Sequence, residues 1–313
     1  MTHAHADHAR WGMKHYLAHE DSREVLKLRL GADISLETVP YAQSIFRHGV
    51  EISLHPAGHI PGSAQIRLSH KGRVAVVSGD YKVEDDGLAT PFTPVPCHEF
   101  VSECTFGLPI YKWPQQQQLM AEINNWWATQ AAAGYNVLLF AYSLGKAQRI
   151  LKHLDASIGP IFVHGAIHHT NEALKENGIP LPEATLVTRD TPKSALKGAC
   201  IIAPPAAMNS PWAKKFSPYR TGICSGWMNI RGTRRRKAAD AGFVLSDHAD
   251  WEGLNQAIEA SGAETVYLTH GSTHAFARYL SEEKGRHAVP LETLFEGEQV
   301  DAREDHDQEA PEA

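Results

Sequence analysis

The chain has 313 residues, of which 42% are hydrophobic and 21% charged, as in ordinary globular proteins. It has no apolar run of membrane-spanning length, no apolar stretch typical of a signal peptide and no CxxC pair among its four cysteines, so we expect a cytoplasmic protein with free thiols and no membrane partner. The net charge of −6 comes from the end of the chain, because Glu296–Ala313 holds eight acidic residues and one basic residue.

The first part of the chain predicts mainly β-structure. A short helix is expected over Arg23–Leu30. Strands follow at Glu51–Leu54, Gln65–Leu68, Val74–Val77 and Glu99–Ser102, with a turn at Lys71-Gly72. A helix is predicted over residues 115–133, and Gly134 ends it.

In the second part of the chain, strands and helices alternate. After a turn at Ser143–Gly145, a helix is expected to run through Leu154. Short apolar strands are predicted at Val137–Phe140, Ile161–Val163, Cys200–Ala203, Phe243–Leu245 and Thr265–Leu268. This alternation predicts an α/β layered protein. Residues 299–313 are acidic with almost no apolar side chains, so we expect a disordered tail there.

The strongest local signal is the N-terminal sequence THAHADH, residues 2–8. In an extended segment His3 and His5 project to the same side, because side chains alternate. Asp7 and His8 follow in a turn, where they can face a second ion. Imidazole and carboxylate groups are ligands of Zn²⁺ or Mn²⁺. A chance His-rich terminus is the weaker alternative, because the pattern fixes four residues at set spacing.

Three later residues supply the remaining ligands for two ions. His59 lies in GHIPGS just after a strand, Asp80 ends the Val74–Val77 strand, and His270 ends the Thr265–Leu268 strand. A single histidine at a strand end is more often a hydrogen-bonded structural residue. The shared location of all three at strand ends, where α/β proteins build their sites, favours a common metal site.

These motifs together resemble the metallo-β-lactamase superfamily. Glu103 in SECTFG and His248 in LSDHAD resemble the first and second motifs of its β-CASP nucleases, and His270 resembles the third. The segments Ser225–Met228 and Gly242–Trp251 are most similar to bacterial ligase-associated DNA exonucleases. The resemblance covers about residues 2–298.

The resemblance implies a role for each matched residue. One ion is held by His3, His5, His59 and Asp80, and the other by Asp7, His8, Asp80 and His270. Two divalent cations, with Zn²⁺ preferred to Mn²⁺, stabilise the charge of a phosphodiester and lower the pKa of water. His248 protonates the leaving oxygen, and Glu103 orients its imidazole. From the residues alone, Glu103 could equally be a surface carboxylate and His248 a loop or capping histidine.

Two segments are candidates for nucleic-acid binding. The sequence FAYSLGKAQ forms a strand, a turn and a helix, so Ser143 and Lys146 can contact a phosphate there, although it lacks the spacing of a Walker motif. The densest basic run contains Arg231, Arg234, Arg235 and Arg236. A solvated helix face is the usual alternative, but Thr191–Ala239 has ten Lys or Arg residues and no acidic residue, which favours a phosphate-binding groove.

The expected fold is a metallo-β-lactamase αββα sandwich with an inserted α/β β-CASP domain. We expect the sandwich to comprise residues 1–113 and 242–298, the insertion residues 114–241, and the tail residues 299–313. Relatives carry a hairpin and an Asp-containing motif before HxHxDH, so we expect this N-terminal hairpin to be missing here.

The resemblance implies a metal-dependent phosphodiesterase that acts on DNA, as an exonuclease in DNA repair or end processing. A DNA ligase or helicase is the partner that family association suggests. A β-CASP ribonuclease is the second candidate, because RNA-cleaving members carry a histidine at the position of His270. A thioester or lactam hydrolase on the same fold and a binding protein with an inactive site are weaker alternatives. Neither the basic stretch nor Glu103 and His248 would be needed by a hydrolase of small molecules.

Overall fold

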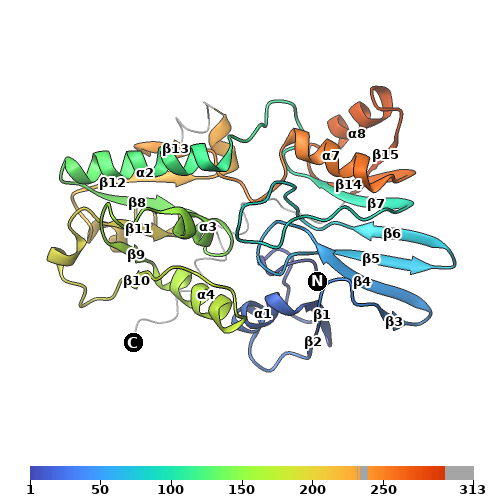
Figure 1. Cartoon of the computed structure of the whole chain (residues 1–313), viewed down its shortest axis with the longest axis horizontal. Helices are drawn as coiled ribbons and strands as arrows, with labels where there is room; N and C mark the ends of the chain where they lie inside the picture. The colour runs from blue at the N-terminus through green and yellow to red at the C-terminus, as the bar shows by residue number, and fades with distance from the viewer. Residues whose placement is uncertain (231, 233–238, 293–313) are drawn as a thin grey trace. The chain divides into compact units, whose positions relative to one another are not determined.

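The computed structural model describes residues 1–230, 232 and 239–292 (Figure 1). The predicted contacts Arg231, Arg234, Arg235 and Arg236 lie outside the described residues, and so does the predicted tail. The chain divides into two compact units. Of the described residues, the first unit comprises Met1–Lys112, Glu176–Ile179 and 247–292. The second comprises Trp113–Lys175 and Pro180–Ser246, without the residues that lie outside the description. Among the described residues, no helix has the length and apolar character needed to cross a membrane.

The first unit is built on a seven-stranded mixed sheet with the order β15-β14-β7-β6-β5-β4-β3. Its strands are β3 (Ile45–Arg47), β4 (Val50–Pro56), β5 (Ala64–His70), β6 (Arg73–Val77), β7 (Glu99–Cys104), β14 (Thr265–Gly271) and β15 (His287–Pro290). Adjacent strands in the run β3-β4-β5-β6 are antiparallel, and adjacent strands in the run β6-β7-β14-β15 are parallel. The five strands predicted in this region of the chain are confirmed, whereas β3 and β15 were not predicted.

Tight turns join the antiparallel strands. At the β5–β6 hairpin, Lys71 and Gly72 have φ values of 47° and 80°, and at the β3–β4 hairpin His48 and Gly49 have φ values of 50° and 81°. Positive φ at both central residues is the requirement of the two-residue turn that matches the twist of antiparallel strands. The turn predicted at Lys71-Gly72 is therefore confirmed.

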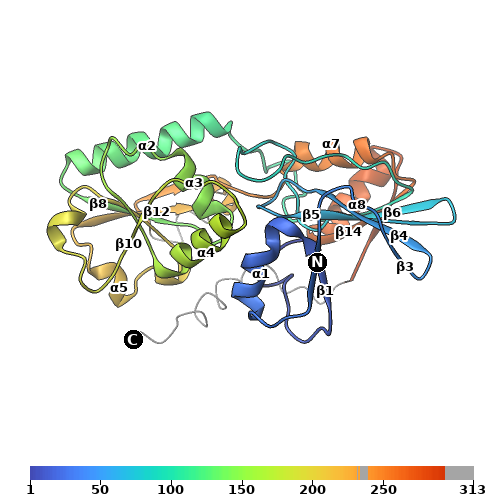
Figure 2. The same ribbon diagram turned by 60° about the horizontal axis from the view of Figure 1, so that its bottom comes forward.

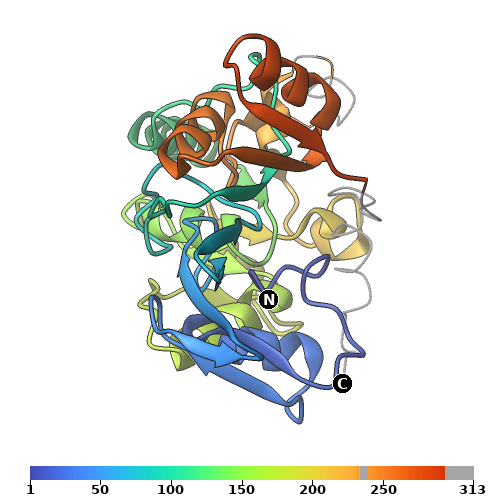
Figure 3. The same ribbon diagram turned by 90° about the vertical axis from the view of Figure 1, so that its right-hand side faces the viewer.

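Both faces of this sheet are covered (Figures 2 and 3). On one face, α7 (Trp251–Ser261) and α8 (Thr273–Glu282) bury apolar side chains against Val76, Phe100 and Val266. On the other, a small parallel sheet of β1 (Tyr16–His19) and β2 (Leu36–Val39) joins a core with β4 and β5. Helix α1, at Arg23–Leu30 as predicted, connects β1 to β2.

The second unit is a doubly covered, wholly parallel sheet with the order β10-β9-β11-β8-β12-β13. Its strands are β8 (Asn136–Phe140), β9 (Ile161–Val163), β10 (Thr185–Leu186), β11 (Cys200–Ala203), β12 (Tyr219–Cys224) and β13 (Ala241–Phe243). Its described helices of eight or more residues are α2 (Gln116–Ala132), α3 (Lys146–His153) and α4 (Gly165–Glu176). Side chains from these three helices pack on one face, and Ala213 and Phe216 help to cover the other. The predicted α/β character holds for both units.

The strand predicted at Phe243–Leu245 lies two residues earlier in the structure, where β13 pairs with β12. The expected return to the first unit at residue 242 therefore falls inside a strand of the second unit, and the compact units change at Asp247. Apolar residues continue beyond the last ladder hydrogen bonds, so composition alone does not mark the strand end.

His19 makes the stability of the first unit depend on pH. Its imidazole stacks on Tyr41, with ring centroids 3.4 Å apart, and its Nδ1 accepts a hydrogen bond from the backbone N–H of Asp21. Burial lowers the pKa of His19 from its ordinary value of 6.5 to about 4. A lowered folded-state pKa gives stability that is present above pH 6.5 and is lost as pH falls toward 4, because the unfolded chain binds the proton more readily.

We predict that chelator-treated protein loses part of its free energy of unfolding between pH 6.5 and 4 through this residue. In His19→Asn the amide oxygen can still accept from Asp21, but the titrating group is gone. The stability difference between wild type and variant should therefore shrink as pH falls. Urea unfolding at a series of pH values measures it, and a difference that stays constant would contradict this role for His19.

Candidate metal centre

The N-terminal segment brings its four charged or polar ligand candidates to one place. Thr2 accepts a backbone hydrogen bond from Ala64 at 2.7 Å, which ties the segment to the start of β5. The chain then turns, since the N–H groups of His8 and Ala9 both bond to the carbonyl of His5. This turn, predicted from the HxHxDH spacing, lets residues on both of its sides face the same point.

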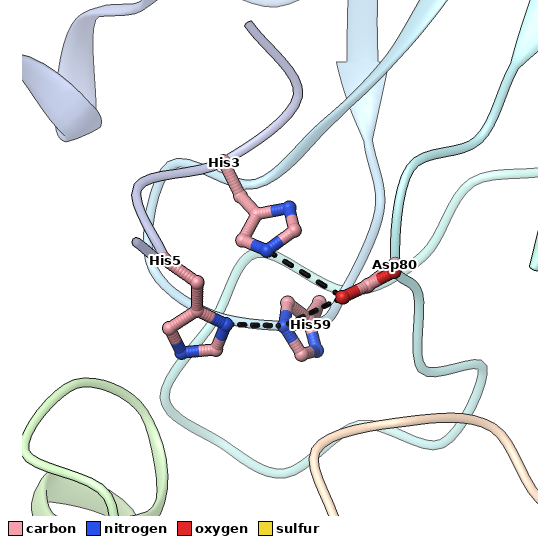
Figure 4. A group of neighbouring side chains, drawn as sticks. All are labelled: His3, His5, His59 and Asp80. Carbon is pink, nitrogen blue, oxygen red and sulfur yellow. Dashed lines mark hydrogen bonds and ion pairs between the residues drawn. The ribbon is translucent and has the colours of Figure 1, made fainter. Parts of the chain in front are cut away.

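His3 and His5 meet His59, which comes from the loop between β4 and β5 (Figure 4). The three ring centroids lie 4.7–4.9 Å apart. The loop can approach so closely because Gly58 has a φ of +72°, and a Cβ there would lie 2.2 Å from the carbonyl oxygen of Lys82. His59 Nδ1 donates to the carbonyl of Asp247 at 2.8 Å, so its Nε2 is left with the lone pair that a metal ligand needs.

Asp80 lies at the centre of the cluster. Its Oδ2 is 3.6 Å from His3 Nε2, 3.5 Å from His8 Nε2 and 3.9 Å from His59 Nε2. Its Oδ1 is 3.4 Å from His270 Nδ1. A single carboxylate thus faces histidines from both predicted ligand sets, which is the arrangement expected of a bridging ligand.

A glycine beside Asp80 explains why the cluster can close. Gly79 has a φ of +59°, and a Cβ there would lie 2.5 Å from the Cβ of Thr2. Only a residue without a side chain lets the end of β6 and the N-terminal segment come this close. Gly79 therefore allows the close approach that brings Asp80 beside the N-terminal ligands.

Electrostatics favour an ionised Asp80 carboxylate beside neutral imidazoles at His3 and His59. Burial acts to raise the pKa of Asp80, but the neighbouring histidines, His8 foremost, hold it well below its usual range. Burial lowers the pKa of His3 far below 6.5 and also lowers that of His59. Burial would lower the pKa of His270 too, but the neighbouring carboxylate of Asp80 outweighs this and raises it. Neutral imidazole and ionised carboxylate are the protonation states that bind metal.

Several buried polar atoms in the cluster lack a hydrogen-bond partner among the described residues. They are His3 Nε2, Asp7 Oδ1 and Asp80 Oδ1. Buried polar atoms are nearly always paired, so three such atoms in one cluster need an explanation. Divalent cations would satisfy all three, and the residues therefore fit such ions.

The structure gathers the predicted ligands into overlapping groups whose ligand atoms lie within 4.8 Å of one another. These groups are His3, His5, His59 and Asp80; His3, Asp7 and His8; and His8, Asp80 and His270. All seven predicted ligands are thus brought together. Asp7 differs slightly from expectation, because it groups with His3 and His8 rather than with His270.

Glu103 and His248 form a buried pair beside the ligands. His248 Nδ1 lies 2.9 Å from both carboxylate oxygens of Glu103. Glu103 also accepts the backbone N–H of Tyr81 at 2.9 Å, which fixes its orientation. Ligand-type atoms of Glu103 and His248 also lie within 4.8 Å of Asp80. The contributions of Tyr81 and Asp247 could not be predicted from the sequence, because both residues act through backbone groups that residue type does not reveal.

The predicted phosphate contacts of the second unit are buried. Ser143 is 4% exposed and Lys146 is 2% exposed. Lys146 Nζ lies 4.5 Å from the ring centroid of Tyr142, and the carbonyl of Ser143 accepts from Gln148. Gly145, with a φ of +91°, allows the sharp entry into α3. Lys146 is the first residue of α3, and both side chains are enclosed by protein.

Sequence comparison finds relatives that are larger than this chain. No known family model matches it. It is 31% identical over 284 residues to a protein named "Probable DNA ligase" from Opitutus terrae, covering 90% of this chain and 27% of the relative. It is 31% identical over 124 residues to endoribonuclease YSH1 of Eremothecium gossypii, covering 38% of this chain and 16% of the relative. The chain thus spans about a quarter or less of these relatives.

A solved structure supports the α/β fold. A protein of unknown function from Enterococcus faecalis superposes with a TM-score of 0.60 at 11% identity, covering 95% of this chain and 79% of that one. The sequence relatives support the resemblance of this chain to the metallo-β-lactamase and β-CASP superfamily.

We predict that Asp80→Asn lowers the affinity for divalent cations by at least about 100-fold. Loss of a residue that only hydrogen-bonds to a metal ligand already lowers metal affinity by about 10–100-fold, and Asp80 faces both ligand sets directly. Zn²⁺ titration by calorimetry, with metal content by mass spectrometry, measures the change. Asp85→Asn is the matched control: Asp85 lies in the same loop, is exposed, and bonds to the N–H of Gly87. Unchanged Zn²⁺ affinity in Asp80→Asn would rule out a metal centre built around this residue.

Proposed function

We propose that this protein is a two-metal nuclease of the metallo-β-lactamase and β-CASP type that hydrolyses phosphodiester bonds in DNA. The observation that carries the proposal is the position of the Glu103–His248 pair beside the seven clustered ligands, within 4.8 Å of Asp80. Metal ligands alone would suit many hydrolases. A buried carboxylate–imidazole pair next to them supplies the proton donor that an alkoxide leaving group needs.

Two divalent cations, Zn²⁺ or alternatively Mn²⁺, would be held by the clustered ligands. His3, His5, His59 and Asp80 would hold one, and His8, Asp80 and His270 with Asp7 the other. When bound, such ions neutralise the charge of a phosphodiester and lower the pKa of water. The surrounding residues keep this ligand set ordered, since the carbonyl of Asp247 fixes the His59 ring through a 2.8 Å hydrogen bond.

His248 is the proton donor in this proposal. Because its Nδ1 bonds to Glu103, the proton that it gives to the leaving oxygen is carried on Nε2. The Glu103 carboxylate stabilises the cationic imidazole, and the N–H of Tyr81 holds that carboxylate in place. His248 is 5% exposed, so its ring has little contact with bulk water.

The architecture that we propose is an αββα sandwich with a β-CASP insertion. In the first unit two sheets share a core, with α7 and α8 on one side and α1 joining the strands of the smaller sheet. The second unit is formed by one run of sequence, residues 113–246, that interrupts the first unit; only residues 176–179 within this run belong to the first unit. Both features support the proposed division of the chain.

DNA is the preferred substrate. The match to the protein named "Probable DNA ligase" covers 90% of this chain, whereas the match to the endoribonuclease covers 38%. The first match supports an exonuclease that prepares DNA ends for a ligase partner. Under this proposal, Lys146 contributes positive potential at the start of α3, and Ser143 lies in the turn before it. The arginines Arg231, Arg234, Arg235 and Arg236 would bind the backbone of the DNA.

A ribonuclease is the second candidate. His270 stands at the position where RNA-cleaving members of the resembled family carry a histidine, and its 3.4 Å approach to Asp80 makes it part of the ligand cluster. We expect the purified protein with Zn²⁺ or Mn²⁺ to shorten DNA oligonucleotides from an end, and RNA of the same sequence at least about tenfold more slowly. Denaturing gels of end-labelled strands measure both rates. Faster cleavage of RNA would reverse the assignment.

We predict that His248→Ala lowers kcat for cleavage by about 10²–10⁴-fold, the usual contribution of a general acid, and leaves Zn²⁺ affinity and DNA binding within about twofold. Single-turnover cleavage and fluorescence anisotropy with labelled DNA measure the two properties. His287→Ala is the control, because His287 is exposed on β15. Wild-type turnover in His248→Ala would remove this residue from the mechanism.

A further inference from the structure

The end of β14 is irregular at the residue where it carries a predicted metal ligand. From Thr265 to Thr269, β14 pairs with β7 residue by residue. Thr269 then pairs with Glu103, but Gly271 pairs with Cys104, so His270 is an extra residue in the ladder. Such bulges are rare between parallel strands, and they redirect a side chain next to an active site.

The bulge requires unusual backbone conformations. His270 has a φ of +58° and Gly271 a φ of +75°. A positive φ is uncommon for a residue with a side chain and persists where the surroundings enforce it. At Gly271 a Cβ would lie 2.3 Å from the carbonyl oxygen of Cys104, so only glycine allows β7 and β14 to remain this close.

One side chain holds the bulge directly. The thiol of Cys104 donates to the carbonyl oxygen of His270 with a sulfur–oxygen distance of 2.8 Å. Cys104 is fully buried and packs in the same core as Phe276 of α8. Its sulfur is therefore fixed by packing, and its hydrogen bond fixes the peptide that carries His270.

This hydrogen bond links the core of the unit to the ligand cluster. Rotation of the His270 peptide would swing the imidazole away from Asp80, whose Oδ1 is 3.4 Å from Nδ1. It would also change the approach of His270 to His8, whose ring centroid lies 5.6 Å away. In contrast, His3, His5 and His59 are carried by segments that do not include the bulge.

We propose that Cys104 is a positioning residue for His270, and that its thiol selectively supports the binding of the cation that His8, Asp80 and His270 would share. This inference rests on the two-metal centre of the proposed function. The Cys104 thiol should affect the binding of one of the two ions only. A general contribution of Cys104 to the stability of the core would instead affect both.

The test compares Cys104→Ala and Cys104→Ser with the control Cys97→Ala. Cys97 is the matched control because it is buried in the same core cluster and its thiol hydrogen-bonds with Ser261 rather than with His270. Full-length protein is stripped with a chelator and titrated with Zn²⁺ by calorimetry. Co²⁺ absorption spectra report the coordination geometry, and urea unfolding of the metal-free forms reports stability.

We expect Cys104→Ala to bind one of two Zn²⁺ ions about 10–100-fold less tightly and the other ion within about twofold of wild type. Cys104→Ser should restore both affinities, because a hydroxyl donates to the same carbonyl. Cys97→Ala should bind both ions normally even where it lowers stability as much as Cys104→Ala does.

Three results would overturn the inference while leaving the nuclease proposal intact: two normal affinities in Cys104→Ala, equal weakening of both ions, or no recovery in Cys104→Ser. A wild-type protein that binds neither Zn²⁺ nor Mn²⁺ would overturn the inference and the proposed function together. Cleavage activity is measured separately, so a metal-binding protein without nuclease activity would count against the proposed function alone.

Discussion

The ionised carboxylate of Asp80, buried among four histidines, is the interaction on which the site depends. Its oxygens lie 3.4–3.9 Å from ring nitrogens of His3, His8, His59 and His270. Burying a carboxylate is costly unless opposite charges or hydrogen bonds compensate. The histidines supply that compensation, and the orphaned nitrogen and oxygen atoms of the cluster indicate that divalent cations would complete it.

Close backbone approach is what allows these residues to meet. A Cβ at Gly58, Gly79 or Gly271 would lie 2.2–2.5 Å from an atom of a neighbouring segment. Each of the three glycines lies next to a predicted ligand. Exchanging any of them for a larger residue would separate the segment from its neighbour and move the adjacent ligand. The position of each of these ligands therefore depends on the glycine beside it.

Groups that are not themselves predicted ligands also orient the residues of the site. The carbonyl of Asp247 holds the His59 ring, the N–H of Tyr81 holds Glu103, and the thiol of Cys104 holds the peptide of His270. These contacts come from the loop after β6, from the end of β7 and from the segment before α7. Because all of them lie in the first unit, its sheet and core position both the ligands and the proposed proton donor.

The sequence by itself determined the α/β class, most strand positions and the ligand types, because alternation, apolar runs and the HxHxDH spacing are local properties. It did not determine where β13 ends or which sheet it joins, since pairing with β12 depends on residues distant in the chain. Only the tertiary structure decided that Ser143 and Lys146 are buried. The contact of Glu103 with His248 was implied by the family resemblance, and the structure supplies its geometry. It also decided that His270 sits on a bulge, since ladder register is a relation between two strands that neither strand encodes alone.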